Sequence, residues 1–410
     1  MSTLLATRMR GLRASEIREI LKLTRRPEVI SFAGGLPASE LFPVERMMTI
    51  SSEVLAREGR QVLQYSPTEG DASLREAIAA RMARRFGVHL GPDEILVTSG
   101  SQQGLDLTGK LLLDEGDAVL CESPTYLGAI QAFEAYRPRF RDVPTDDEGM
   151  VLSALERRLS DQAAAKLVYV VPDFQNPSGR CWSLERRVAL LRLAGRFGVT
   201  VVEDCPYGEL RFRGPELPAL KSLDREGLVV YLGTFSKVLC PGLRVGWLAA
   251  SRALLEKYVL AKQGADLHTS SLTQRLIAAY LQRFDLDEDI RRIREVYRQR
   301  CDVMLRTMDE EFPPGIRYTR PDGGLFLWVE LPETLNARDL LVKCLARDVA
   351  FVPGGSFFPN GGHENTLRLN FSAMPPERIR EGVRRLSEVL RETLGRPAGR
   401  PLREALAPTA

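Results

Sequence analysis

Short apolar runs alternate with amphipathic stretches through the middle of the chain. The runs at 167–171 and 200–203 are almost continuously apolar, which is typical of parallel strands covered on both faces. Between such runs, apolar residues recur at helical spacing. This alternation predicts an α/β fold, in which helices cover both faces of a mainly parallel seven-stranded sheet. We expect strands at 95–98, 118–121, 140–143, 167–171, 200–203, 228–232 and 245–249, and helices at 102–113, 127–136, 152–159 and 184–197.

The pattern changes towards the C-terminus. Helices are expected at 254–262 and 273–283, and a longer charged amphipathic helix at 287–311 should lead out of the large domain. Beyond it, the pattern predicts a smaller α+β domain, with strands at 316–319, 325–330, 350–353 and 366–371 and helices at 337–347 and 376–394. We therefore expect four parts: an N-terminal arm and helix at 1–44, a large domain at 45–286, a small domain at 287–394, and a tail rich in proline and glycine at 395–410.

Composition narrows the class of protein. The 410 residues are 44% apolar, which is enough for a buried core. Lys and Arg total 57 against 54 Asp and Glu, and a net charge of +3 gives no indication of a nucleic-acid or membrane partner. The six cysteines and three histidines have no spacing that indicates a metal site. We find neither a signal peptide nor an apolar run long enough to cross a membrane, so we expect a cytoplasmic protein with reduced thiols.

Two motifs with turn chemistry follow predicted strands. The first, TSGSQQG at 98–104, places Ser101 where it can cap the next helix, whose free N–H groups and dipole attract a phosphate. An ordinary helix cap is the alternative interpretation. The second, PDFQNPSG at 172–179, contains Asn176 and by itself would indicate a loop. In open α/β sheets, however, ligands bind beyond the carboxyl ends of the strands, which would direct Asn176 into the site.

Two charged residues also follow apolar strands. Asp204 ends the run in TVVEDCPYGEL at 200–210, where a buried carboxylate needs a partner such as a protonated pyridine nitrogen. The alternative is a helix or turn cap. Lys237 lies in GTFSKVLCPGLRVG at 233–246, before Arg244 and among few other charges. A desolvated lysine has a lowered pKa and attacks aldehydes, whereas the alternative is a lysine on a surface loop.

These motifs together resemble a known family. The order Ser-x-Gln, Asn-Pro-Ser-Gly, Asp-x-x-Tyr, Ser-Lys and then Arg resembles the class I/II aminotransferases of fold type I, over about residues 11–395. The segments LQYSPTEG, KQGADLHT, RYTRPDGG and VPGGSFFPNGG are similar to the 2-aminoadipate, kynurenine and aromatic branch of that family. The resemblance implies a fold type I transferase that uses pyridoxal 5′-phosphate. The segments Cys205-Pro206 and Arg180-Cys181-Trp182 depart from the pattern of that branch, which leaves substrate choice open.

The resemblance also implies roles for individual residues towards the cofactor. Lys237 would hold pyridoxal phosphate as a Schiff base and then move the proton of the substrate α-carbon. Asp204 would pair with the pyridine nitrogen, which makes the ring an electron sink. Asn176 and Tyr207 would hydrogen-bond the 3′-oxygen, and Tyr126 would stack on the ring. Lys237, Asp204 and Tyr207 are the expected catalytic residues. The phosphate would be held by Ser101, Gln102, Thr234, Ser236 and Arg244.

Further implied residues concern the substrate and a second subunit. Arg368 would bind the substrate α-carboxylate through its planar fork, beside Asn176, or it could be a surface arginine at a strand edge. Gly35 would let backbone approach the substrate. Tyr65 would reach the substrate and the cofactor phosphate of a neighbouring subunit, which implies a homodimer with shared sites; core packing is the alternative. The N-terminal helix would cover the site beside the small domain. On it, Ser15 and Arg18 would contact the substrate, although Arg18 could equally be solvated.

The function that follows is transamination. We expect an amino group to move between an L-amino acid, of the 2-aminoadipate, aromatic, kynurenine or branched-chain type, and a 2-oxo acid, with 2-oxoglutarate and glutamate as one pair. A lyase, decarboxylase or oxidase on the same scaffold is an alternative, because the scaffold fixes the cofactor and not the fate of the substrate. A second alternative is a regulator with an aminotransferase-like domain. Such regulators carry an N-terminal DNA-binding domain, and the resemblance here already begins near residue 11.

Overall fold

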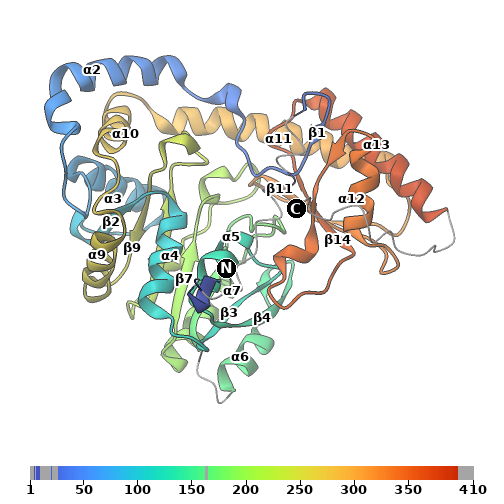
Figure 1. Ribbon diagram of the computed structural model, residues 1–410, viewed down its shortest axis with the longest axis horizontal. Helices are drawn as coiled ribbons and strands as arrows, with labels where there is room; N and C mark the ends of the chain where they lie inside the picture. Colours follow the sequence, from blue (N-terminus) through green and yellow to red (C-terminus); the bar gives the residue numbers. More distant parts are fainter. Residues whose placement is uncertain (1–3, 5, 10–19, 21–25, 162–164, 396–410) are drawn as a thin grey trace.

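The large sheet of the protein has eight strands, and helices pack around it (Figure 1). The computed structural model describes residues 4, 6–9, 20, 26–161 and 165–395. All seven predicted strands are confirmed, and a two-residue strand at the sheet edge, β5, was not predicted because it is too short to show a pattern. The strands are β2 (Ile95–Thr98), β3 (Ala118–Ser123), β4 (Arg139–Asp146), β5 (Gly149–Met150), β6 (Ala165–Val170), β7 (Thr200–Asp204), β8 (Val229–Thr234) and β9 (Gly246–Ala249).

The strand order explains why the predicted motifs meet. The order is β2-β9-β8-β7-β6-β3-β4-β5, and the neighbours from β8 to β4 pair in parallel. Strand β9 is antiparallel to both of its neighbours, and β5 is antiparallel to β4. The carboxyl ends of β3, β6, β7 and β8 therefore lie along one edge of the sheet, where ligands bind in folds of this kind.

Each face of the large sheet has its own core. On β6, Leu167 and Tyr169 belong to the larger apolar cluster, while Val168 and Val170 belong to the second cluster. Successive side chains of a strand point to opposite faces of the sheet. Because both faces of β6 are buried from Leu167 to Val170, each of these positions has to be apolar, which explains the continuously apolar run in the sequence. The predicted helices between these strands are confirmed: α4 (Ser101–Leu112), α5 (Leu127–Glu134), α6 (Leu152–Ser160) and α7 (Leu184–Phe197), as are α9 (Arg252–Asp266) and α10 (Ser271–Arg283).

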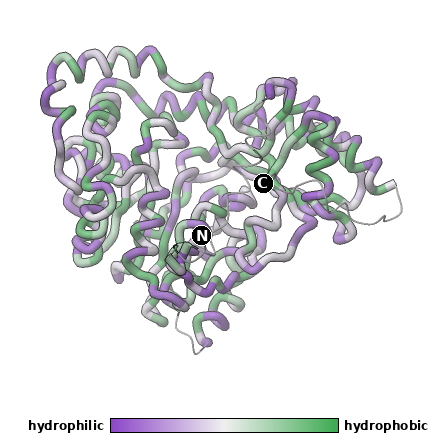
Figure 2. Tube along the Cα trace, in the orientation of Figure 1, coloured by the Kyte–Doolittle hydropathy of each residue, from purple (hydrophilic) through white to green (hydrophobic). Residues whose placement is uncertain are grey.

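Two amphipathic helices at the start of the large part were not predicted, α2 (Val44–Val62) and α3 (Ala72–Phe86). Asp71 caps α3, since its carboxylate accepts from the backbone N–H of Leu74 at 3.0 Å. Helix α2 packs against α10. Helix α13 (Pro376–Leu394) lies at the opposite end of the molecule (Figure 1). Hydrophobic and hydrophilic residues alternate along both α2 and α13 in Figure 2, as expected for helices with one face in water.

The second sheet is small and antiparallel, with the order β10-β11-β14-β13. The long helix α11 (Leu286–Glu311) leads to it and packs against α13. The predicted strand at 350–353 is two short strands, because β12 pairs in parallel with β1 while β13 joins β14. These elements are β1 (Ile30–Ser31), β10 (Arg317–Tyr318), β11 (Phe326–Glu330), α12 (Ala337–Leu345), β12 (Val349–Ala350), β13 (Val352–Pro353) and β14 (Thr366–Asn370).

The four-part division of the chain stays a prediction. One pairing bears on it, because β1 belongs to the predicted N-terminal arm and β12 to the predicted small domain. The predicted N-terminal helix, apart from Ile20, and the tail beyond Gly395 lie outside the described residues. Within the described part of the chain, no helix is long and apolar enough to cross a membrane.

Candidate active site

A cavity of about 470 Å³ opens at the carboxyl edge of the large sheet, between that sheet and β11 and β14 of the small one. Its walls combine cationic, amide, hydroxyl and aromatic side chains from segments that are far apart in the sequence. It contains twelve of the residues singled out in the sequence, namely Gly35, Ser101, Gln102, Tyr126, Asn176, Asp204, Tyr207, Thr234, Ser236, Lys237, Arg244 and Arg368.

Lys237 follows β8 and extends into this cavity. Its Nζ donates a hydrogen bond to the backbone oxygen of Gly35 at 2.8 Å, and no carboxylate among the described residues pairs with it. Burial, together with the positive charges of Arg368 and Arg244, lowers the pKa of Lys237 to about 8. A substantial fraction of this amine is therefore neutral and nucleophilic near physiological pH.

This lowered pKa predicts a pH dependence for the protein without cofactor. The neutral amine is the reactive form, so the rate at which it captures an aldehyde should rise with pH and level off above about 8. The rate of pyridoxal phosphate uptake, followed by its change in absorption at several pH values, measures this. A midpoint near the ordinary lysine value of about 10.4 would show that the amine is not desolvated.

Asp204 is the last residue of β7 and has one carboxylate oxygen free for a ligand. Its Oδ2 accepts a hydrogen bond from the hydroxyl of Tyr169 at 2.9 Å, while the buried Oδ1 has no partner within the described residues. Burial raises the pKa of Asp204 to about 7, against which the Tyr169 hydrogen bond acts. A buried acceptor without a donor is costly, and a protonated ring nitrogen would satisfy it. The chain's own residues thus fit a pyridinium group at this point.

The other end of the cavity is built for an anion. Arg244 reaches over the turn before α4, with Nη2 at 3.5 Å from the oxygen of Ser99 and Nη1 at 3.5 Å from Oγ of Ser236. Hydroxyls of Thr234 and Ser236 lie 2.9 Å apart beside it. The expectation that Ser101 caps α4 is wrong, because Gly100 holds the cap position with φ +80° and Ser101 is the first helical residue. Free N–H groups at this helix end still suit a phosphate.

Gly100 is needed at this turn for two reasons, which gives a second prediction. Its φ is positive, and a Cβ there would overlap the guanidinium of Arg244. The substitution Gly100→Ala should therefore displace Arg244 and weaken cofactor binding by about tenfold, equivalent to about 1.4 kcal/mol. Equilibrium titration with pyridoxal phosphate measures the change, and Gly242→Ala, where a Cβ meets nothing within 4 Å, is the control. If Gly100→Ala bound pyridoxal phosphate as tightly as Gly242→Ala does, glycine would not be required at position 100 for cofactor binding.

Arg368 enters the cavity from β14 and is 1% exposed. Its guanidinium donates to Oδ1 of Asn176 at 2.8 Å and to the oxygen of Ala33 at 2.7 Å, while Nε has no partner within the described residues. It lies over the rings of Phe326 and Phe357, at 4.2 and 5.2 Å from their centroids. Burial lowers the pKa of Arg368 to about 10. A buried cation held mainly by neutral partners is well placed to bind an anion.

Two tyrosines complete the walls. The ring of Tyr126 lies so close to Gly128 that a Cβ there would overlap it, and Tyr207 contacts Phe326 edge-to-face at 5.8 Å. Burial raises the pKa of both phenols, so they stay neutral hydrogen-bond donors. Gln102 turns its amide to the oxygen of Gly128 at 2.9 Å.

One described residue among those predicted, Tyr65, does not line this cavity. Tyr65 is 77% exposed and meets His268 edge-to-face at 5.8 Å, so the alternative of core packing is wrong. Ser15 and Arg18 lie outside the described residues.

Two residues that support the site, Tyr169 and Phe326, were not predicted from the sequence. Tyr169 was missed although it stands in a buried strand whose register places it beside Val202 on β7, two residues before Asp204. A lone hydroxyl in an apolar run was the available signal. Phe326 was missed because a phenylalanine in a strand is ordinary core, and nothing in its pattern indicates the guanidinium above it.

The fold and the cavity fit an α/β transferase that holds a phosphorylated pyridine cofactor beside a nucleophilic amine. The chain belongs to the aminotransferase class I and II family, whose sequence model matches residues 27–386. It is a transaminase, and its cofactor is pyridoxal 5′-phosphate.

Similar proteins define the branch within this family. The chain is 45% identical to aromatic-amino-acid aminotransferase 1 of Thermococcus litoralis, over 94% of this chain and 93% of that protein. It is 50% identical to the 2-aminoadipate transaminase of Thermus thermophilus, over 93% and 95%. The crystal structure of Pyrococcus horikoshii kynurenine aminotransferase, in complex with PMP, KYN and KYA, matches with a TM-score of 0.92 at 41% identity, over 96% of this chain and 98% of that one. The protein is thus an aminotransferase of the multiple-substrate, 2-aminoadipate and kynurenine type.

Proposed function

We propose that the protein transfers an amino group between glutamate and a second L-amino acid through their 2-oxo acids. The second substrate is of the 2-aminoadipate, aromatic, kynurenine or branched-chain type. The observation that carries this proposal is the buried guanidinium of Arg368, which lies in the same cavity as Lys237. All these substrates share an α-carboxylate, which the planar guanidinium of Arg368 can bind through two hydrogen bonds. Their side chains, which differ in chemistry, would extend into another part of the cavity.

The residues of the cavity divide the work of this reaction. Bound pyridoxal phosphate supplies a ring that withdraws electrons from the substrate α-carbon. Asp204 holds the proton on the ring nitrogen through its free Oδ1. Arg368 fixes the α-carboxylate, and the neutral Nζ of Lys237 takes the proton from the α-carbon. Tyr207 and Asn176 hold the 3′-oxygen of the ring, and Arg244 holds the phosphate with Ser101, Gln102, Thr234 and Ser236.

The substitution Arg368→Gln tests the carboxylate role. It should raise KM for both the amino acid and the 2-oxo acid and lower kcat/KM by about 10²-fold, as expected when a buried charge partner of an anion is removed. Steady-state kinetics with glutamate and 2-oxoglutarate measure this. Arg317→Gln is the matched control, since Arg317 is also on the small sheet and its side chain is 82% exposed. Unchanged KM values in Arg368→Gln would overturn the proposed function.

Arg18 is proposed to bind a distal carboxylate, on the strength of the resemblance. A panel of amino donors with 2-oxoglutarate should show whether Arg18→Ala loses activity selectively on acidic donors. Equal loss on leucine, phenylalanine and 2-aminoadipate, or no loss, would count against this role.

A homodimer with shared sites is also proposed. Along α2, Val44, Met48 and Leu55 are exposed apolar residues at helical spacing, and Leu63 and Tyr65 follow with 70% and 77% exposure. Such a stripe is typical of a surface that another chain covers. We propose that a second copy covers it and that Tyr65 reaches the cofactor phosphate of that copy.

Mixing two inactive variants tests the shared site. A Tyr65→Ala chain and a Lys237→Ala chain, unfolded and refolded together, would form mixed dimers in which one site has both native residues. Activity above the sum of the separate variants supports the proposal. Activity equal to that sum would place Tyr65 in the site of its own chain, and a monomer by sedimentation would refute the dimer.

A further inference from the structure

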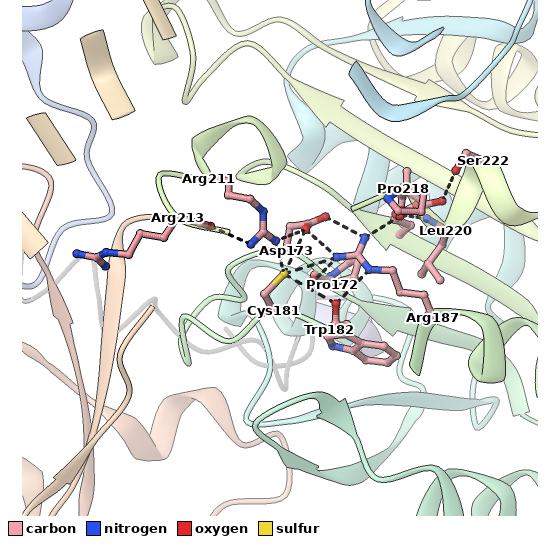
Figure 3. A network of polar contacts seen from close by, with 12 residues as sticks. Pro172, Asp173, Cys181, Trp182, Arg187, Arg211, Arg213, Pro218, Leu220 and Ser222 are labelled. Carbon is pink, nitrogen blue, oxygen red and sulfur yellow. Dashed lines mark hydrogen bonds and ion pairs between the residues drawn. The ribbon is translucent and has the colours of Figure 1, made fainter. Parts of the chain in front are cut away.

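Arg187 is a fully buried arginine that does not line the active-site cavity. Arg187, on α7, has 0% exposure, and its guanidinium binds the Asp173 carboxylate through both terminal nitrogens, at 2.7 and 3.2 Å (Figure 3). It also donates to the backbone oxygens of Pro172, Trp182 and Pro218 at 3.1, 3.3 and 3.0 Å. Burial acts to lower the pKa of Arg187, but the Asp173 carboxylate more than offsets this and the pKa is raised, so the guanidinium stays charged.

These contacts hold both ends of one loop. The loop leaves β6 at Pro172 and returns at Trp182, whose N–H donates to the oxygen of Pro172 at 2.8 Å. Arg187 contacts the oxygens of these same two residues. On the other side, the buried carboxylate of Glu122 accepts from the indole of Trp182 and from the N–H of Val171, both at 2.9 Å. The base of the loop is therefore fixed on one side by the Arg187–Asp173 pair and on the other by the buried carboxyl group of Glu122.

The loop carries Asn176 into the active site. Asn176 is 4% exposed and accepts from Arg368, the residue proposed to bind the substrate carboxylate. Between Asp173 and Asn176 stands Phe174, a bulky residue with φ +50°. That conformation is unfavourable for a residue with a Cβ and persists only where the surroundings impose it. The guanidinium of Arg211, at 4.7 Å from its ring centroid, and the close approach of Gly323 and Gly324 supply such surroundings.

The buried pair gives the loop a fixed geometry more than it gives stability. Replacing a buried ion pair by apolar groups is often neutral for stability, whereas removing one partner is costly. Hydrogen bonds from a rigid guanidinium to several backbone oxygens, in contrast, define position and direction. We propose that Arg187 with Asp173 is a positioning pair for the reaction: it sets the place of Asn176 and, through it, the orientation of Arg368 towards the substrate carboxylate, without touching substrate or cofactor.

This inference rests on the proposed carboxylate role of Arg368. It predicts a specific kinetic change in the double variant Asp173→Asn/Arg187→Met, which removes both charges of the pair. Arg211, whose Nη2 lies 3.7 Å from Oδ1 of Asp173, keeps its hydrogen bond to the backbone oxygen of Arg213. KM for the amino acid and for the 2-oxo acid should rise about tenfold or more, the size of effect expected when a binding group is displaced by a fraction of an ångström. The affinity for pyridoxal phosphate should change less than the KM values, within about threefold, because the phosphate site is formed by other segments and Asn176 contributes one neutral hydrogen bond to the ring.

The matched control is Arg186→Met. Arg186 is the neighbour of Arg187 on the same helix and binds Asp146 and Glu148. Within the described residues, none of its side-chain hydrogen bonds reaches the loop from Pro172 to Trp182. Its KM values should equal those of the wild type. Thermal unfolding and cofactor absorption of all variants separate a kinetic change from a loss of structure.

Each outcome decides the inference. Raised KM in a folded double variant that keeps cofactor affinity supports it. Unchanged KM, an equal rise in Arg186→Met, or loss of folding in the double variant would overturn it and leave the pair as part of the core only. If Arg368→Gln raises KM and the double variant does not, this inference alone fails; if Arg368→Gln has no effect, the proposed function fails with it.

Discussion

Replacing Lys237 with alanine should lower kcat for transamination by about 10²–10⁴-fold or more, because one amine both anchors the cofactor and moves the α-proton. The variant should also lose the visible absorption of the lysine-bound cofactor. Turnover with glutamate and a 2-oxo acid measures the first change and a spectrum measures the second. The structural reason is the isolation of this amine, which has a pKa of about 8 and hydrogen-bonds a backbone oxygen but no carboxylate within the described residues.

A surface lysine provides the control for this prediction. Lys257 on α9 is exposed, so Lys257→Ala should leave kcat and the spectrum unchanged. If Lys237→Ala kept more than about a tenth of the wild-type kcat, its role as the proton carrier would be untenable.

Removing the charge of Asp204 should have the second largest effect. In Asp204→Asn the shape is kept, but the side chain no longer holds a proton on the ring nitrogen, so kcat should fall by about 10²–10³-fold. Asp204 is suited to this role because Oδ1 is buried without a partner within the described residues, while Oδ2 is fixed by Tyr169. Single-turnover rates with glutamate measure the loss in the chemical step.

Tyr169→Phe is the companion variant. The hydroxyl of Tyr169 lowers the pKa of Asp204, against the larger effect of burial, so its removal should raise that pKa above about 7. The carboxylate remains, and kcat should therefore fall far less than in Asp204→Asn, with the acid limb of the pH–rate profile of the free enzyme moved to higher pH. Equal losses in the two variants would contradict the assigned role of the charge.

Particular residues show what the sequence could predict and what it could not. Asp204 and Lys237 were found because each follows an apolar strand, and parallel strands bring their carboxyl ends to one edge. The expectation that Ser101 caps α4 was wrong, because a glycine with positive φ at the cap position leaves no trace in periodicity. Tyr169 depends on cross-strand register, which a single chain does not reveal.

Contacts distant in the sequence were the least predictable. Arg368 and Asn176 are 192 positions apart, and Arg187 has the helical spacing of an ordinary amphipathic position although it is fully buried. Long-range polar contacts of this kind depend on how loops close over the sheet, and the pattern of apolar residues sets only the sheet. The sequence does not show which substrate side chains the enzyme accepts for the same reason, since that selectivity depends on cavity walls formed by several segments.

The most direct test of the central claim is chemical. The protein with bound pyridoxal phosphate is reduced with borohydride, digested, and its peptides are analysed by mass spectrometry. The account predicts one phosphopyridoxyl group, on Lys237, within the segment from Gly233 to Gly246. A label on any other lysine, or a protein that binds the cofactor and carries no label after reduction, would contradict it.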